Sequence, residues 1–239
     1  MSDKLVIMRV LLHVILLLAC TALTPVVPQY EPLVQDFNTA RKHTQKTIIF
    51  FITPTHQEYT QIADLTRMSQ FLQVATKVEG HNVYWLVVED SPDHCSARIR
   101  HLLDRSGLAY GHVHQASAKV SSSARFGLKM NKGINQRNFA LDIIENRYID
   151  NSQLSRNAVI YFADGDNTYD TRLVDELVKT RGVSVFPVGF TAGLLYERCL
   201  VDEKTGLVAG FVGWRGGRKF PIDMAGFSIS LQVCLESCL

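Results

Sequence analysis

The stretch AVIYFADGDNTYD, residues 158–170, joins an apolar run directly to two carboxylates one residue apart. Its first six residues are apolar, rich in β-branched and aromatic side chains, and show no polar alternation. That composition is typical of a short strand buried on both faces of a parallel sheet, with helices covering each face. The stretch therefore predicts an α/β fold in which Asp164 and Asp166 leave the carboxyl end of a buried strand.

The rest of the chain repeats the pattern of a strand followed by a helix. Further apolar runs predict strands, at residues 47–53, 83–88, 110–114 and 183–188. Apolar residues at helical spacing predict helices, around residues 62–72, 99–103, 134–145 and 171–180. This alternation predicts a mostly parallel sheet flanked by helices, with ligands bound beyond the carboxyl ends of the strands. The serine-rich residues 117–129 predict a loop.

Length and composition indicate a globular protein. The chain has 239 residues, of which 46% are hydrophobic and 20% are charged, and this is enough to bury a sizeable core. The formal net charge of +2 is too small for the electrostatic footprint of a nucleic-acid binder. The composition therefore excludes DNA and RNA as expected partners.

The amino-terminal segment is predicted to target the chain to a membrane. Lys4 and Arg9 precede an apolar run that Pro25 and Pro28 close. We expect residues 1–9 to form a cytoplasmic tail, 10–27 a signal-anchor transmembrane segment, 28–46 a stem and 47–239 the folded domain. A cleaved signal peptide is the alternative. Both interpretations send the rest of the chain into the secretory pathway, and the pairing of its five cysteines cannot be read from their spacing.

The pair Asp164 and Asp166 has the chemistry of a cation site. Residues two apart on an extended backbone point to the same side, so the two carboxylates can converge on one ion. Oxygen ligands of this kind favour a hard cation such as Mg²⁺ or Mn²⁺. A plain polar turn is an open alternative. A calcium loop is disfavoured because Tyr169 stands where its turn glycine belongs, and the Asp-x-Asp-x-Thr pattern of phosphohydrolases is disfavoured because three predicted strands come earlier.

Two other strand ends also deliver polar residues. The run at 83–88 continues into Glu89 and Asp90, and the run at 47–53 continues into Pro54 and Thr55. Because the carboxyl ends of parallel strands meet at one edge, these residues are expected to converge with the acidic pair. Three such strand ends suit the base, the ribose and the diphosphate of a nucleotide.

Six motifs in this order resemble a known family. They are Pro54-Thr55, VED at 88–90, GINQRN at 133–138, YFADGDNTY at 161–169, VSVFPVG at 183–189 and DMAGF at 223–227. From about residue 46 to residue 239 the chain resembles the β-1,3-glucuronosyltransferases of glycosyltransferase family 43. The resemblance implies a GT-A nucleotide-sugar transferase fold on a type II Golgi membrane anchor. It also implies an inverting transfer from UDP-glucuronate to a galactose-terminated glycan acceptor with Mn²⁺ as cofactor, and it leaves a homodimer open.

The resemblance also implies roles for individual residues. Asp166 matches the metal ligand. The implied donor-binding residues are Pro54, Thr55, His56, Asp90, Lys132, Arg137, Asp164, Gly165 and Asp166. The implied acceptor-binding residues are Glu197, Trp214, Arg218 and Asp223. The alternatives left open are a solvated helix charge for Arg137 and ordinary core packing for Trp214.

The chain departs from the family pattern in ways that bear on catalysis. Gly165 replaces the middle acid of the family's triple-acid motif, His56 replaces a tyrosine, and Lys132 stands where arginine is usual. No carboxylate matches the family's glutamate base after Phe227, which leaves Asp223 as the candidate base. Two functions are therefore expected as alternatives: a working glucuronosyltransferase, or a catalytically impaired, truncated homologue that binds UDP-sugar or pairs with an active enzyme.

Overall fold

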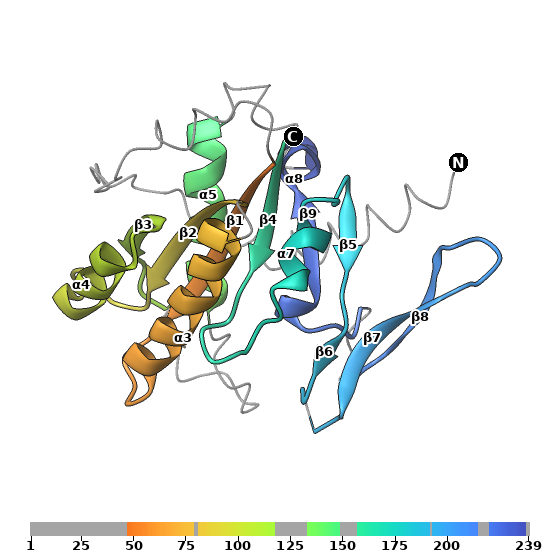
Figure 1. The fold of residues 1–239 in the computed structure, drawn as a ribbon, viewed down its shortest axis with the longest axis horizontal. Coiled ribbons are helices and arrows are strands. Elements are labelled where there is room, and N and C mark those ends of the chain that lie inside the picture. Colours follow the sequence, from red (N-terminus) through yellow and green to blue (C-terminus); the bar gives the residue numbers. More distant parts are fainter. Residues whose placement is uncertain are drawn as a thin grey trace, which may run out of the picture.

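The structure, a computed structural model, describes residues 47–78, 81–117, 133–148, 157–191, 193–214 and 220–237. Its centre is a six-stranded sheet in the order β3-β2-β1-β4-β9-β5, beside a small three-stranded sheet in the order β6-β7-β8 (Figure 1). The strands are β1 (Ile48–Thr55), β2 (Asn82–Glu89), β3 (Ala109–His114), β4 (Ala158–Phe162), β5 (Val183–Val185), β6 (Val188–Gly189), β7 (Tyr196–Val201), β8 (Val208–Val212) and β9 (Phe227–Ser230). The helices are α3 (Gln61–Gln73), η1 (Val74–Val78), α4 (Ala97–Ser106), α5 (Ile134–Tyr148), α7 (Arg172–Leu177), η2 (Met224–Gly226) and α8 (Leu231–Ser237).

The predicted mixed α/β architecture with a mostly parallel sheet is confirmed. Strand β1 pairs in parallel with both β2 and β4, and β2 pairs in parallel with β3. Strand β9 runs antiparallel to its two neighbours, β4 and β5. The apolar runs that predicted β1, β2 and β4 therefore lie side by side at the centre of the sheet.

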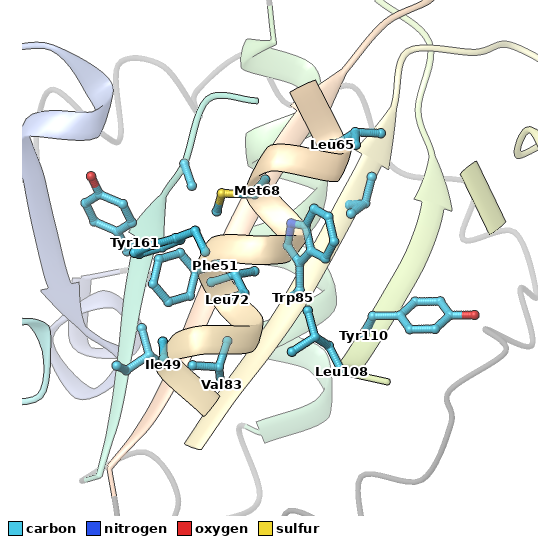
Figure 2. Close-up of a cluster of buried hydrophobic side chains, with 14 of the residues drawn as sticks. Ile49, Phe51, Leu65, Met68, Leu72, Val83, Trp85, Leu108, Tyr110 and Tyr161 are labelled. Carbon is cyan, nitrogen blue, oxygen red and sulfur yellow. The ribbon is translucent and has the colours of Figure 1, made fainter. Parts of the chain in front are cut away.

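Alternate residues of β1 pack on opposite faces of the sheet, as the two-residue period of a strand requires. Ile49 and Phe51 belong to a cluster under α3, α4 and α7, whereas Phe50 and Ile52 belong to a second cluster under α5 and α8. Figure 2 shows the first cluster, in which α3 lies across the sheet. Each large side chain buried in this way contributes about 1.5–3 kcal/mol relative to an exposed one.

Trp85 is fully buried at the middle of the first cluster. Its indole N–H donates to the Thr53 hydroxyl at 2.9 Å, so burial of the ring leaves no donor unsatisfied. On β1, its parallel neighbour in register is Phe51. The two central strands are thus joined by packing and by a side-chain hydrogen bond close to the end of β1.

Some predicted elements differ from the structure. The predicted strand at 183–188 is two strands in different sheets, β5 and β6, because Pro187 has no N–H and the N–H of Phe186 donates to the Gly226 carbonyl at 2.7 Å. Helix α7 ends before the predicted residue 180, where the Thr180 hydroxyl binds that of Ser228 at 2.8 Å. The hairpin β7–β8, strand β9 and helix α8 were not predicted.

The membrane segment predicted at 10–27 and the loop predicted at 117–129, except its first residue, lie outside the described residues. Among the residues that are described, no helix is both long enough and apolar enough to cross a bilayer.

Candidate nucleotide-sugar site

The carboxyl ends of β1, β2 and β4 open into one cavity of about 390 Å³. Every predicted donor-binding residue except Lys132, which lies outside the described residues, lines this cavity: Pro54, Thr55, His56, Asp90, Arg137, Asp164, Gly165 and Asp166. The expected convergence of three strand ends therefore occurs, as parallel topology requires.

Arg137 reaches the cavity from the first turn of α5 and is buried. Its guanidinium donates to a carboxylate oxygen of Asp164 and forms an ion pair with it. Gly133 lies directly beside this guanidinium with a φ of 76°, and a Cβ there would come within 2.7 Å of Arg137 Nη1. The alternative that Arg137 is a solvated charge on a helix is therefore wrong.

Asp164 carries a perturbed carboxyl group. Burial raises its pKa above the ordinary value, and the charges of Asp223 and Asp166 raise it further, while the Arg137 guanidinium opposes both effects. The phenolic O–H of Tyr169 donates to the backbone carbonyl of Asp164 at 2.9 Å and fixes the chain there. Asp164 thus acts with Arg137 as one buried charge pair in the wall of the cavity.

Asp166 differs from Asp164 in its surroundings. Strand β4 ends at Phe162 and residues 165–166 form a turn, so the two acids do not share the extended backbone that the sequence suggested. Asp166 is exposed, and within the described residues its carboxylate has no hydrogen-bond or ion-pair partner. An unengaged carboxylate in a cavity with oxygen-rich walls fits a hard divalent cation.

Arg67 of α3 holds the turn that carries Asp166. Its guanidinium donates to the backbone carbonyl of Asp166 at 3.0 Å, with longer contacts of 3.4 Å to the carbonyls of Gly165 and Asn167. Asp64, one turn earlier on the helix, accepts from the same guanidinium at 2.9 Å. The sequence does not reveal this arrangement, because a helical arginine with an acid three residues earlier also fits an ordinary surface pair.

Two residues that the sequence did not single out support the other strand ends. The N–H of Ser117 donates to Asp90 at 2.7 Å, and its hydroxyl donates to the second carboxylate oxygen. The amide of Gln61 donates to the Thr55 hydroxyl at 3.1 Å. Ser117 lies at the start of the predicted loop, and no local pattern connects it with an acid 27 positions earlier.

The predicted acceptor residues lie in and after the hairpin β7–β8, apart from Arg218, which is outside the described residues. Glu197 is buried and accepts the backbone N–H of Trp214 at 3.0 Å. Trp214 is 55% exposed, so the alternative of core packing is wrong. Glu197 therefore positions the backbone at Trp214 and leaves the indole accessible.

Asp223 lies between the two groups of predicted residues. Its charge contributes to the raised pKa of Asp164, which places it close to the donor cavity. Its carboxylate accepts the N–H of Ala225 at 2.9 Å and the hydroxyl of Thr191 at 3.3 Å, and so caps η2. These contacts give Asp223 a structural role as a helix cap.

Fold and cavity together define an α/β protein with an acidic ligand site at the carboxyl edge of its sheet. The chain belongs to glycosyltransferase family 43, whose family model matches residues 72–238. This finding confirms the resemblance seen in the motifs.

Individual relatives agree with the family match. The chain is 40% identical over 195 residues to human galactosylgalactosylxylosylprotein 3-beta-glucuronosyltransferase 2, across 81% of this chain and 56% of the relative. It is 39% identical over 195 residues to the human enzyme numbered 1, across 79% and 54% of the two chains. It is 36% identical over 197 residues to the human enzyme numbered 3, across 79% and 56%. The chain thus spans about half the length of the relatives it matches.

Proposed function

We propose that this chain is an inverting, Mn²⁺-dependent glucuronosyltransferase of GT-A type that transfers glucuronic acid from UDP-glucuronate to the 3-hydroxyl of a terminal galactose. One observation carries the proposal. The ends of β2 and β4 place the carboxylates of Asp90, Asp164 and Asp166 around a single cavity, and α5 adds the guanidinium of Arg137. The names of the matching relatives supply the sugar and the acceptor class.

Each side chain of the cavity has chemistry suited to one part of the donor. Asp90, held at both carboxylate oxygens by Ser117, offers fixed acceptors for the N–H or O–H groups of a nucleoside. The Arg137 guanidinium offers a planar cation that suits a carboxylate or a phosphate. Asp166 would hold the divalent cation, which when bound supplies positive charge to the leaving diphosphate. The exposed ring of Trp214 offers an apolar face to an acceptor sugar.

A second candidate function rests on the contacts of Asp223. A general base needs a carboxylate oxygen that can reach the acceptor hydroxyl. Both oxygens of Asp223 already accept hydrogen bonds, from Ala225 and Thr191. A general base typically contributes about 10²–10⁴ in rate, so a chain that relies on Asp223 would bind UDP-sugar and turn over slowly. The family match favours both of these candidates over phosphohydrolysis.

The cellular setting is part of the proposal. Residues 10–27 would form a signal anchor that holds the folded domain, 47–239, in the Golgi lumen as a type II membrane protein, and the chain could act as a homodimer. The apolar run between Arg9 and Pro25 supports the anchor.

The test combines nucleotide binding with product formation. The purified chain is titrated with UDP with and without Mn²⁺, and is then incubated with UDP-glucuronate and a galactose-terminated acceptor. We expect Mn²⁺ to strengthen UDP binding, Asp166→Asn to remove that effect, and Asp170→Asn to keep it, because Asp170 is an exposed acid paired with Arg172. A glucuronide product supports the enzyme, and Mn²⁺-dependent binding without product supports the second candidate. A UDP affinity that changes neither with Mn²⁺ nor with Asp166→Asn would refute the proposal.

A further inference from the structure

A second group of ligating side chains lies at the neighbouring strand ends. Glu89 is the last residue of β2, His112 lies on β3, and Cys95 stands two residues before α4. One ligand atom from each residue lies within 4.8 Å of those of the other two. The parallel register of β2 and β3, together with the return of the chain toward α4, brings the three together.

The side chains of this cluster are largely buried, and one of their polar atoms has no hydrogen-bond partner among the described residues. The side chains of His112 and Glu89 are 3% and 9% exposed, and Nε2 of His112 lies 3.2 Å from Oε2 of Glu89. Among the described residues, Nδ1 of His112 is buried and has no hydrogen-bond partner. A buried imidazole nitrogen without a partner is unusual in a native protein. Nε2, the nitrogen beside Glu89, is the atom that would bind an ion, and the low exposure of the cluster and the spacing of its three ligand atoms support this role.

Further contacts hold the three ligating groups in place. Oε2 of Glu89 accepts the backbone N–H of Ser96 at 2.7 Å, and the Cys95 thiol donates to the His112 carbonyl at 3.6 Å. The carboxylate, the thiol and the imidazole are therefore positioned beside one another by the backbone of β3 and of the segment before α4.

We propose that Glu89, Cys95 and His112 bind one divalent transition-metal ion of the zinc class, at a site separate from the acidic cavity. One sulfur, one nitrogen and one oxygen ligand suit Zn²⁺ and not Mg²⁺ or Mn²⁺, which prefer oxygen. Zinc bonds of about 2.0–2.3 Å need the ligand atoms roughly 3–4 Å apart, so the cluster closes with small side-chain movements. Binding breaks the S–H bond of Cys95, forms the metal–sulfur bond and releases the proton to solvent.

The site is next to a cavity, and its position between β2, β3 and α4 would give a bound ion a structural role. Glu89 lines a second cavity, of about 940 Å³, which reaches the site at this carboxylate. The bound ion would tie the end of β2 to β3 and to the segment before α4. Glu89 directly precedes Asp90 in the chain, so the same ion would stiffen the strand end that carries this acid into the nucleotide cavity.

Cobalt provides a direct test because a thiolate bound to Co²⁺ absorbs in the near ultraviolet. The purified chain is dialysed against a chelator and titrated with Co²⁺. We expect one equivalent to produce a sulfur-to-cobalt charge-transfer band that Zn²⁺ abolishes by displacement. Cys95→Ser should remove the band, and Glu89→Gln should weaken binding at least tenfold. Cys199→Ser, at another half-buried free cysteine, should keep the band.

Two further measurements separate this site from the donor site and from folding defects. Asp166→Asn should leave the cobalt band unchanged, because that carboxylate belongs to the other cavity. X-ray absorption of the zinc-loaded wild-type chain should show one sulfur at about 2.3 Å and lighter ligands at about 2.0 Å, with no variant needed. A spectrum without sulfur, a wild-type chain without the cobalt band, or a band that survives Cys95→Ser would overturn the proposal.

Discussion

Replacing Arg137 by methionine should destabilise the domain by about 3 kcal/mol. Its side chain is 11% exposed and that of its partner Asp164 is 27% exposed, so the substitution leaves a largely buried carboxylate without its cation. Loss of one partner of a buried ion pair costs about 3–5 kcal/mol, and the partial exposure of Asp164 favours the lower value. For a domain of this size the midpoint of thermal unfolding should fall by roughly 6–12 °C.

A double-mutant cycle isolates the pair from the loss of packing. Asp164→Asn removes the charge that Arg137→Met leaves uncompensated, so the double variant should be at least about 1 kcal/mol more stable than the sum of the two single losses. Urea unfolding followed by the fluorescence of buried Trp85 measures all four free energies. A cost below about 1 kcal/mol for Arg137→Met, or strict additivity in the cycle, would refute the assignment of a coupled buried pair.

Three further perturbations follow from the geometry. Arg67→Met should weaken Mn²⁺-dependent UDP binding about fivefold to tenfold in calorimetry, because the Asp166 turn loses a hydrogen bond worth about 1–1.5 kcal/mol; unchanged affinity would contradict this role. Gly133→Ala should lower the free energy of unfolding more than Gly206→Ala, since both have positive φ but only the first would clash with a guanidinium; equal losses would contradict the clash. Burial raises the pKa of Tyr161 and Tyr169 in the folded chain. As the pH rises, the unfolded chain therefore loses these two protons at a lower pH than the folded chain does. The free energy of unfolding should fall above pH 10, by up to about 1.4 kcal/mol per pH unit for each tyrosine. Urea midpoints from pH 9 to 11 measure this slope. Tyr169→Phe should make the slope shallower, and an unchanged slope in that variant would contradict the prediction.

The centre of the fold could be predicted because its signals are local. The apolar runs behind β1, β2 and β4 are continuous, and each ends in polar residues. Parallel topology then places those ends at one edge without further information. The sequence alone therefore predicts that Thr55, Asp90 and Asp164 lie close together.

The rest depends on contacts that no local pattern encodes. The ion pair of Arg137 with Asp164 and the hydrogen bonds of Ser117 to Asp90 each join residues 27 positions apart. The insertion of β9 between β4 and β5 is set by tertiary packing, and its run of four residues is too short to reveal direction or position. Pro187, by contrast, is a local signal in the sequence for the break between β5 and β6. The apolar residues on both sides of it favour one continuous strand instead.

The place of β9 in the sheet constrains the order of assembly during synthesis. Among the strands that the structure describes, β5 bonds only to β9 within the main sheet, and β9 also covers the free side of β4. Until residues 227–230 leave the ribosome, β4 presents an open edge and β5 has no docking partner. A nascent chain halted before that point would expose unpaired backbone groups to other chains, so aggregation during translation should depend on how quickly β9 arrives.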